Sequence, residues 1–450
     1  MNSALEVAVE IGRETVFAGT AYLTQRGKSV STVFIYEPSY FANKDAYELD
    51  PGLPLESGQH AVRGLVGAFS DCAPHRWGRN LIAKRIRAAS LREHQTPPAI
   101  LEIDYFTGVS DVTRQGALRF RLPGTSEFVD PDSAVPKLID LPELLPASDA
   151  IGRDPDGFDA IKALLAAGTG TLGGARPKAS VRDQDRLYIA KFPKPDDAWN
   201  VMGWEKTALD LAENCGINVS NRRLYSVSGR SVLLLERFDR SASKRIGYVS
   251  AMTVLGAQDG YGADYVDLAQ RLRDIARTSS AELEQLWRRV AFSCLINNTD
   301  DHLRNHGLLR ESNGWKLSPA FDLNPNPNLG EPRQTSIGGA VSPGEELDGL
   351  MSHASSFGLN DTRAREVLGE VLEGCRNWRE AAAGNGIPSS EIDAFCPALD
   401  SLRAMAEARA VDPASRGAPR TMAPRAPDVP GEIEAFRAGI QRSTPPEVGI

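Results

Sequence analysis

The stretch that decides the fold is Asn297 to Asn305, Asn-Asn-Thr-Asp-Asp-His-Leu-Arg-Asn, which follows the apolar segment Leu283 to Ile296. Apolar residues recur in that segment at helical spacing, so the sequence predicts a buried helix that ends in a polar loop. Within the loop, Asp300 and Asn305 stand five positions apart. A polar loop at a helix end is also common surface structure, so this spacing needs support from other parts of the chain.

Support comes from a second aspartate further along the chain. Two short strands are predicted at Gly307 to Arg310 and at Trp315 to Ser318, and Asp322 follows them directly in Pro-Ala-Phe-Asp-Leu. Protein kinases have this order, with a D-x-x-x-x-N catalytic loop, a hairpin and the magnesium-binding aspartate of D-F-G. Here the glycine of D-F-G is absent. Taken alone, Asp322 fits a structural carboxylate equally well.

Upstream, Lys191 stands in the strand-like apolar run Leu187 to Phe192. A lysine buried there needs an anionic partner, because an unpaired buried charge is costly. In kinases such a lysine binds the α and β phosphates and pairs with a helix glutamate. Glu205, early in the helix predicted for Gly203 to Cys215, is the candidate partner. A surface lysine whose amine reaches solvent is the competing interpretation.

The glycine-rich run Gly168 to Gly174 fits the pattern G-x-G-x-x-G. A dinucleotide-binding loop follows a strand and opens a helix, whereas here a helical pattern, Phe158 to Ala167, precedes the run. A hairpin follows, with strands predicted at Lys178 to Arg182 and Arg186 to Phe192. That order disfavours a Rossmann fold and favours a kinase-type loop that brings backbone amides to phosphates. An ordinary flexible loop is the alternative.

A metal-dependent hydrolase is a second way to use the acidic loop. Imidazole and carboxylate groups suit zinc, iron or manganese, and the ligands would be Asp300, Asp301, His302, His306 and Asp322. This hypothesis leaves the glycine-rich run and the strand lysine without a role. A Ser-His-Asp hydrolase is weaker still, because no G-x-S-x-G motif is present.

The composition is that of an ordinary globular protein. The 450 residues are 41% hydrophobic and 24% charged, and the net charge of -8 argues against a grip on nucleic acid by the whole molecule. No basic leader followed by an apolar run and no apolar stretch of membrane-spanning length is present, so we expect a cytoplasmic protein that makes no membrane contact. The cysteines are odd in number and widely spaced, which predicts neither a disulfide framework nor structural zinc: Cys72, Cys215, Cys294, Cys375 and Cys396.

The chain begins with strand-like alternation at Leu5 to Ile11, Thr15 to Leu23 and Val30 to Tyr36. The segment Ala61 to His94 then has apolar residues at helical spacing among many basic ones. Such a helix could contact DNA or a partner, although a solvated basic face is the simpler interpretation. A second hairpin is predicted from Arg223 to Glu236. The last forty residues contain seven prolines, which predicts a flexible tail.

Four blocks together resemble the HipA family of bacterial Ser/Thr protein kinases, the toxin halves of toxin-antitoxin pairs. They are Gly173 to Ala179, Ile189 to Pro193, Glu236 to Arg240, and Asn298 to Asn305 together with Leu317 to Leu323. A further block from Phe69 to Arg79 is similar to the family's N-terminal subdomain. The resemblance covers roughly residues 5 to 400 and is specific in the order and spacing of the blocks.

The resemblance implies an α+β, bilobal protein-kinase-like fold with a β-rich N-terminal subdomain and a mainly helical C-terminal region. We expect a HipA-like N-terminal subdomain over 1–125 and a nucleotide-binding part with glycine-rich loop, strand lysine and hinge over 150–240. A helical catalytic lobe is expected over 241–409, and a flexible proline-rich tail over 410–450.

The resemblance also implies roles for individual residues, with ATP and Mg²⁺ as cofactors. Asp300 would be the catalytic aspartate, and Asn305 and Asp322 would hold magnesium. The family carries a serine just before its Gly-Gly-Ala block whose phosphorylation inactivates the enzyme, and Thr171 occupies that place here. The implied ATP-binding residues are Gly173, Gly174, Lys178, Lys191, Glu205, Glu236, Phe238 and His302.

By the same resemblance, the partners would be a HipB-like DNA-binding antitoxin and a translation-linked protein substrate such as an aminoacyl-tRNA synthetase. DNA would be reached only through the antitoxin. Two rival functions stay open. One is a degenerate kinase fold that serves mainly as a repressor partner, and the other is a small-molecule phosphotransferase with the same catalytic aspartates.

Overall fold

A computed structural model of the chain describes residues 2–27, 29–129, 135–153, 164, 176–241, 244–258, 260, 262–312 and 314–411. The chain divides into two units, Met1–Val411 and Asp412–Ile450. The predicted proline-rich tail belongs to the second unit and, from residue 412 on, lies outside the described residues, so the first unit alone is described below.

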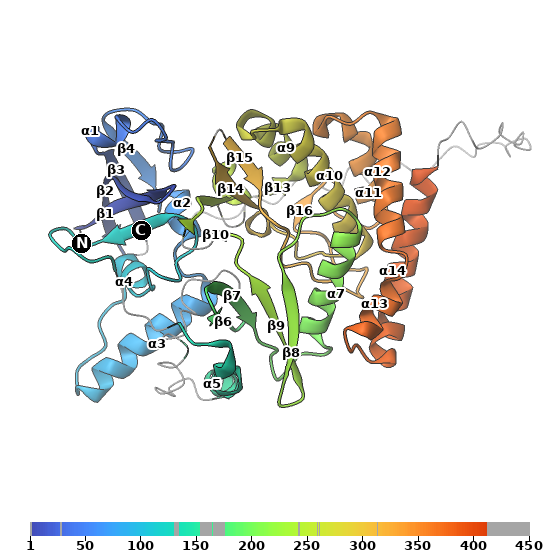
Figure 1. The fold of residues 1–450 in the computed structure, drawn as a ribbon, viewed down its shortest axis with the longest axis horizontal. Helices are drawn as coiled ribbons and strands as arrows, with labels where there is room; N and C mark the ends of the chain where they lie inside the picture. The colour runs from blue at the N-terminus through green and yellow to red at the C-terminus, as the bar shows by residue number, and fades with distance from the viewer. Residues whose placement is uncertain are drawn as a thin grey trace, which may run out of the picture. The chain divides into compact units, whose positions relative to one another are not determined.

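The N-terminal part of the first unit is a five-stranded antiparallel sheet in the order β4-β3-β2-β1-β5 (Figure 1). Alternate side chains of each strand point to one face, which is why Leu5, Val7 and Val9 are all buried there. Phe34 of β3 packs against Phe69 of the helix α2 (Gly67–Asp71). The predicted strands are confirmed as β1 (Asn2–Ile11), β2 (Glu14–Arg26) and β3 (Ser29–Tyr36), and β4 (Gln59–Arg63) and β5 (Leu118–Arg121) complete the sheet.

The prediction of helical structure throughout Ala61 to His94 is wrong at its start. Residues 61–63 belong to strand β4, which pairs with β3, and the helices are α2 (Gly67–Asp71) and α3 (Arg76–Arg92). The run before α2 is too short for its periodicity to separate strand from helix, and pairing with β3 decides the outcome. The short helix α4 (Glu102–Thr107) packs against α3.

A second antiparallel sheet has the order β6-β7-β9-β8 and contains both predicted hairpins. One face packs on α3 and on α5 (Leu141–Arg153) through an apolar cluster that includes Ile82, Leu144 and Ala190. The other face packs on α7 (Val201–Asn214), which begins where the Asn200 side chain accepts a hydrogen bond from the Gly203 amide. The strands are β6 (Lys178–Asp183), β7 (Arg186–Lys191), β8 (Arg222–Val227) and β9 (Arg230–Glu236).

The remainder of the first unit is mainly helical, with α10 (Ser279–Leu295) at its centre. Both ends of the site-bearing loop are fixed, because α10 precedes it and β14 (Gly307–Glu311) follows it and pairs with β12 (Tyr248–Ser250) and β15 (Gly314–Leu317). No helix in the described part of the chain is long and apolar enough to cross a membrane. The surrounding helices are α8 (Ala251–Val254), α9 (Tyr265–Ile275), α11 (Glu345–Ser352), α12 (Asp361–Gly374), α13 (Trp378–Gly384) and α14 (Ser389–Ala410).

A buried ion network joins the end of β9 to the N-terminal part. The Arg237 guanidinium donates to both carboxylate oxygens of Asp239, at 2.8 and 2.6 Å, and to the Thr113 carbonyl at 2.5 Å. Asp239 also accepts from the Gly116 amide and from Arg240. Burial alone would raise the pKa of Asp239, but Arg237 and Arg240 hold it well below its usual value. Three residues of the Glu236 to Arg240 block, Arg237, Asp239 and Arg240, are thus fixed by structural contacts.

This network predicts a large stability effect from one isosteric change. Asp239→Asn removes the negative charge that neutralises the buried Arg237, so we expect the free energy of unfolding to fall by about 3–5 kcal/mol. Urea denaturation at pH 7 measures it. The matched control is Asp400→Asn, whose partner Arg379 is exposed, and there the change is expected to stay within about 1 kcal/mol. Equal losses in the two variants would contradict the structural role of the network.

Candidate active site

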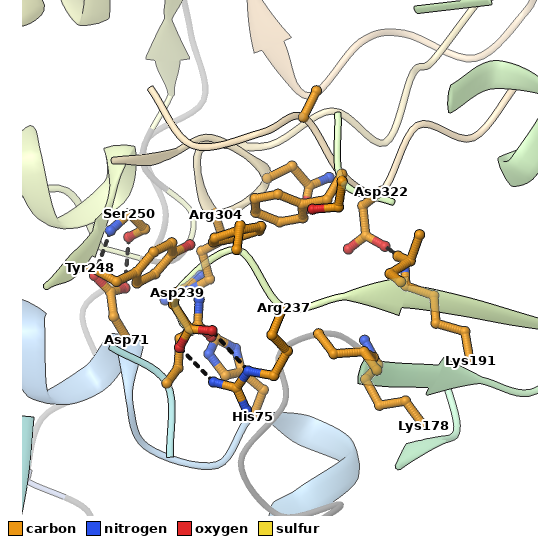
Figure 2. A pocket seen from close by; sticks show the side chains of 18 of the residues that line it. Asp71, His75, Lys178, Lys191, Arg237, Asp239, Tyr248, Ser250, Arg304 and Asp322 are labelled. Atoms are coloured by element: carbon orange, nitrogen blue, oxygen red, sulfur yellow. Dashed lines mark hydrogen bonds and ion pairs between the residues drawn. The ribbon is translucent and has the colours of Figure 1, made fainter. Parts of the chain in front are cut away.

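A cavity of about 610 Å³ lies where the N-terminal part, the second sheet and the helical region meet (Figure 2). The N-terminal part contributes Asp71 and His75, and the second sheet contributes Lys178 and Lys191. This volume is within the range of pockets that bind small ligands. The hinge segment after β9 and the loops around Asn305 and Asp322 complete the lining, with Glu236, Arg237, Phe238, Asp239, His302, Arg304, Asn305, Phe321 and Asp322.

The Lys191 ammonium group lies between two carboxylates. It donates to Glu205 Oε1 at 2.5 Å and to Asp322 Oδ1, and this second pair is drawn in Figure 2. Lys191 is 5% exposed and Glu205 only 1% exposed. The predicted partnership of Lys191 with Glu205 is therefore present in the structure, and the interpretation of Lys191 as a surface lysine is wrong.

Charge explains how these groups coexist in a buried place. Burial alone would lower the pKa of Lys191, but Asp322 and Glu205 raise it, so the amine stays protonated. Burial would raise the pKa of Asp322, but Lys191 and Lys178 hold it well below its usual value. For Glu205 burial is the stronger effect and raises its pKa, with Lys191 opposing. Asp322 is thus an ionised carboxylate at neutral pH.

Three separate elements bring these groups together. β7 presents Lys191, α7 presents Glu205 one turn after its Asn200 cap, and the segment after β15 presents Asp322. Asp322 has a left-handed backbone with a φ of 55°, a conformation that is uncommon outside glycine. The Asn324 side chain donates to the Asp322 carbonyl at 3.2 Å and supports that turn. The Asp322 backbone is thus fixed by local contacts, although no D-F-G glycine is present.

Lys178 lies opposite Lys191 in the register of β6 and β7 and lines the cavity. Both lysines are buried on adjacent strands. Burial lowers the pKa of Lys178 to about 8, although Asp322 and Glu205 counteract this. Two buried lysines therefore line the cavity next to each other, and Lys191 is paired with Glu205 and Asp322.

The loop after α10 divides into structural and outward-facing residues. Asp301 is buried and accepts hydrogen bonds from Tyr265 at 2.5 Å and Ser293 at 2.8 Å, and His306 lies 3.0 Å away. His306 and Arg333 hold the pKa of Asp301 well below its usual value, although burial opposes them. These contacts use Asp301 and His306 inside the protein, so the arrangement does not favour the metal-hydrolase hypothesis.

Asp300 and Asn305 do not point into the core as Asp301 does. The Asp300 side chain is exposed and its Oδ1 accepts from the Gln334 amide at 2.5 Å, while Asn305 lines the cavity. The Asn305 amide donates to the Asp300 carbonyl at 3.3 Å and thereby closes the loop. Partial burial, Asp322 and Asp301 raise the pKa of Asp300, whereas His302 lowers it. Asp300 does not line the cavity itself.

The remaining predicted ligand-binding residues line the cavity with different groups. The Phe238 ring lies 5.6 Å from the Phe321 ring, which creates an apolar wall. The Glu236 carboxylate is bound to Arg186 and Asn221, and the Glu236 backbone amide donates to the Asn221 carbonyl at 2.8 Å. His302 Nδ1 is buried and has no hydrogen-bond partner among the described residues. Gly173, Gly174 and Thr171 lie outside the described residues.

Sequence reasoning missed the part of the cavity that the N-terminal part provides. Asp71 accepts from the backbone amide and the hydroxyl of Ser250, at 2.6 and 2.7 Å, and burial raises the pKa of Asp71 to about 6. Tyr248 lines the cavity beside them. Asp71 and Ser250 are separated by 179 positions in the chain, so no local pattern could have paired them.

The site fits a nucleotide with magnesium. The buried His302 Nδ1 and the two lysines offer polar and cationic partners, and the wall of Phe238 and Phe321 suits an aromatic base. The described part of the chain has no group of three or more His, Cys, Asp or Glu side chains placed to hold a metal. Magnesium tolerates this, because it is commonly bound by one or two protein ligands, substrate phosphates and water. Asn305 and Asp322 are the residues that would hold it.

Fold and site together define a protein of kinase-like architecture. Residues 170–379 match the family model of the HipA-like C-terminal domain. A chain of the solved Shewanella oneidensis MR-1 complex of HipA, HipB and operator DNA has the same fold, with a TM-score of 0.55 at 16% identity. The match covers 90% of this chain and 96% of that one. The predicted α+β, HipA-like fold is confirmed.

Two curated relatives that match part of the chain are named as candidate kinases. A protein of Sinorhizobium fredii named as a candidate kinase, Y4mE, is 26% identical over 201 residues, which is 41% of this chain and 46% of the relative. A Haemophilus influenzae protein, also named as a candidate kinase, is 24% identical over 157 residues, 31% of this chain and 46% of the relative. The chain thus spans about half the length of these curated relatives. The Helicobacter pylori kinase CtkA gives a TM-score of 0.38 at 16% identity, over 53% of this chain and 93% of that one.

The Lys191 and Glu205 pair predicts a non-additive effect on stability. Lys191→Met leaves the Glu205 carboxylate buried without its cation, so we expect the free energy of unfolding at pH 7 to fall by about 3–5 kcal/mol. Adding Glu205→Gln removes the unpaired charge and is expected to restore part of that loss. Urea denaturation of the two single variants and the double variant measures the cycle. Strictly additive losses would show that the two side chains do not interact.

Proposed function

We propose that the protein is an ATP-dependent Ser/Thr protein kinase that acts as a HipA-type toxin in the cytoplasm. The observation that carries the proposal is the Lys191 ammonium held between Glu205 and Asp322 at the end of a cavity that Asn305 also lines. Protein kinases use a lysine paired with a helix glutamate beside a metal-binding aspartate. The order of these residues along the chain supports the same conclusion.

The chain's own residues supply binding and positioning. Lys191 and Lys178 neutralise phosphate charge, and the wall of Phe238 and Phe321 holds the base. Asn305 and Asp322 would hold magnesium, which when bound neutralises the charge of the β and γ phosphates. Asp300 orients the acceptor hydroxyl and takes its proton as the hydroxyl oxygen bonds to the γ phosphorus. The bond from that phosphorus to the β,γ-bridging oxygen breaks, and ADP leaves.

The proposal also names partners. A HipB-like DNA-binding antitoxin would neutralise the toxin, and DNA would be reached through it. The support is the shared fold with a chain from a complex of HipA, HipB and operator DNA. The acceptor would be a translation-linked protein such as an aminoacyl-tRNA synthetase, and Thr171 would be the position of self-phosphorylation. Mass spectrometry of phosphoproteins after brief expression of wild type and of Asp300→Asn identifies the acceptor.

The first functional prediction concerns Asp300. Asp300→Asn keeps the shape of the side chain but cannot accept the hydroxyl proton, so we expect label transfer from γ-labelled ATP to a lysate protein to fall by about 10²- to 10⁴-fold. Binding of ATP with magnesium, followed by calorimetry, is expected to persist. The matched control is Asp185→Asn in the exposed turn between β6 and β7, with activity close to wild type. Unchanged transfer by Asp300→Asn would end the proposal.

The second functional prediction concerns the pH dependence of ATP binding, which involves Lys178. Because its pKa in the free protein is about 8, Lys178 loses its charge above that pH. Binding of ATP then requires that Lys178 take up a proton from solution. We expect ATP affinity to fall as pH rises through about 8, by at most about tenfold per pH unit. Lys178→Arg, charged throughout, is expected to remove this dependence. Lys244→Arg on the exposed β11 (Lys244–Arg245) is the control and should keep the wild-type profile.

A further inference from the structure

Glu331 is an exposed residue in the segment that follows Asp322, and its carboxylate is held in one place. Oε2 accepts a hydrogen bond from the Asn326 side-chain amide at 2.7 Å, and Oε1 accepts one from the Asn328 side-chain amide at 3.0 Å. Both donors are neutral. Among the residues that the structure describes, no lysine or arginine forms an ion pair with Glu331. Its carboxylate is therefore exposed, fixed in position and not neutralised by the described protein.

The Glu331 carboxylate lies beside the loop that carries Asp300. The same Asn326 amide nitrogen that donates to Glu331 also lies 2.9 Å from the hydroxyl oxygen of Thr299. Thr299 directly precedes Asp300 in the chain. A single amide group thus joins the Glu331 carboxylate to the residue next to Asp300, and an acceptor hydroxyl that approaches Asp300 brings its neighbouring groups close to Glu331.

The segment that carries Glu331 is fixed to the same loop by further contacts. The side chain of Asn297, which is buried, donates to the Asn326 and Asn328 carbonyls at 2.8 and 3.0 Å. The Asn328 side-chain oxygen accepts from the Gly330 amide at 2.9 Å, which closes a turn directly before Glu331. A long side chain normally loses rotamer freedom when it binds a partner, and these contacts remove much of that cost in advance.

We propose that Glu331 selects the acceptor of phosphoryl transfer by binding a lysine or arginine side chain close to the hydroxyl that is phosphorylated. The inference rests on the proposed kinase function and adds to it the class of acceptor, a basic segment of a protein. An ammonium or guanidinium group would form charge-assisted hydrogen bonds with a carboxylate that has only neutral partners. An acidic side chain at the same place would be repelled, so Glu331 would also exclude acidic segments.

The first test measures label transfer to the acceptor protein found by mass spectrometry in the Asp300 experiment. Glu331→Gln keeps the shape of the side chain and removes its charge, so we expect the KM for the acceptor to rise about tenfold. The kcat and the KM for ATP should stay at wild-type values, because Glu331 does not line the cavity. Added salt should raise the KM for the acceptor with wild type, and this salt dependence should weaken in Glu331→Gln.

The second test reverses the charges on both proteins. Glu331→Lys is expected to raise the KM for the acceptor by about a hundredfold. Replacing the acceptor's basic residue nearest the phosphorylated position by glutamate should then recover at least about tenfold of that loss. Glu380→Lys on the exposed side of α13 makes the same change in net charge and is the matched control, with wild-type constants expected.

A wild-type KM for the acceptor in both Glu331 variants would overturn the inference, even though Asp300→Asn were inactive. An acceptor with no lysine or arginine beside its phosphorylated residue would overturn it as well. A lower midpoint of thermal unfolding, with equal losses of transfer to the original and the charge-reversed acceptor, would indicate a structural role only and contradict it too. Activity that persists in Asp300→Asn, or the absence of any acceptor protein, would instead reject the kinase proposal itself.

Discussion

The site depends on one constraint, the need to neutralise a lysine ammonium that is almost completely buried. Lys191 meets it with two carboxylates, Glu205 from α7 and Asp322 from the segment after β15. An unpaired charge in that place would cost several kcal/mol, so the second sheet, its helix and the loop from the helical region are held in one arrangement. The same ion contacts place Lys191 and Asp322 side by side in the lining of the cavity.

The N-terminal part contains its own sheet and also contributes residues that line the cavity. Asp239 joins Arg237 to the backbone around Gly116, and Asp71 accepts both hydrogen bonds from Ser250. Both carboxylates line the cavity and both bind across long distances in the chain. The N-terminal part therefore shapes the cavity in which a substrate would meet the lysines. Substitutions in this part are expected to change the shape of the cavity.

In the loop after α10, neighbouring residues of similar chemistry have different roles. Asp301 and His306 face the core and bind Tyr265 and Ser293, which makes the loop rigid. Asp300 faces solvent and Asn305 faces the cavity, and both keep groups for a ligand or a substrate. The metal-ligand set that the sequence allowed placed Asp300, Asp301 and His306 together. Burial on one side of the loop separates them into two.

Periodicity alone predicted the first three strands, the two hairpins and the helix before the loop, and the cost of burying a charge made Glu205 the candidate partner of Lys191. The spacing to Asn305 singled out Asp300, but it did not show that the core covers the neighbouring Asp301. The tertiary structure alone brought Asp71 and Asp239 to the cavity. Their partners are distant in the chain, and contacts between distant residues leave no local pattern to read.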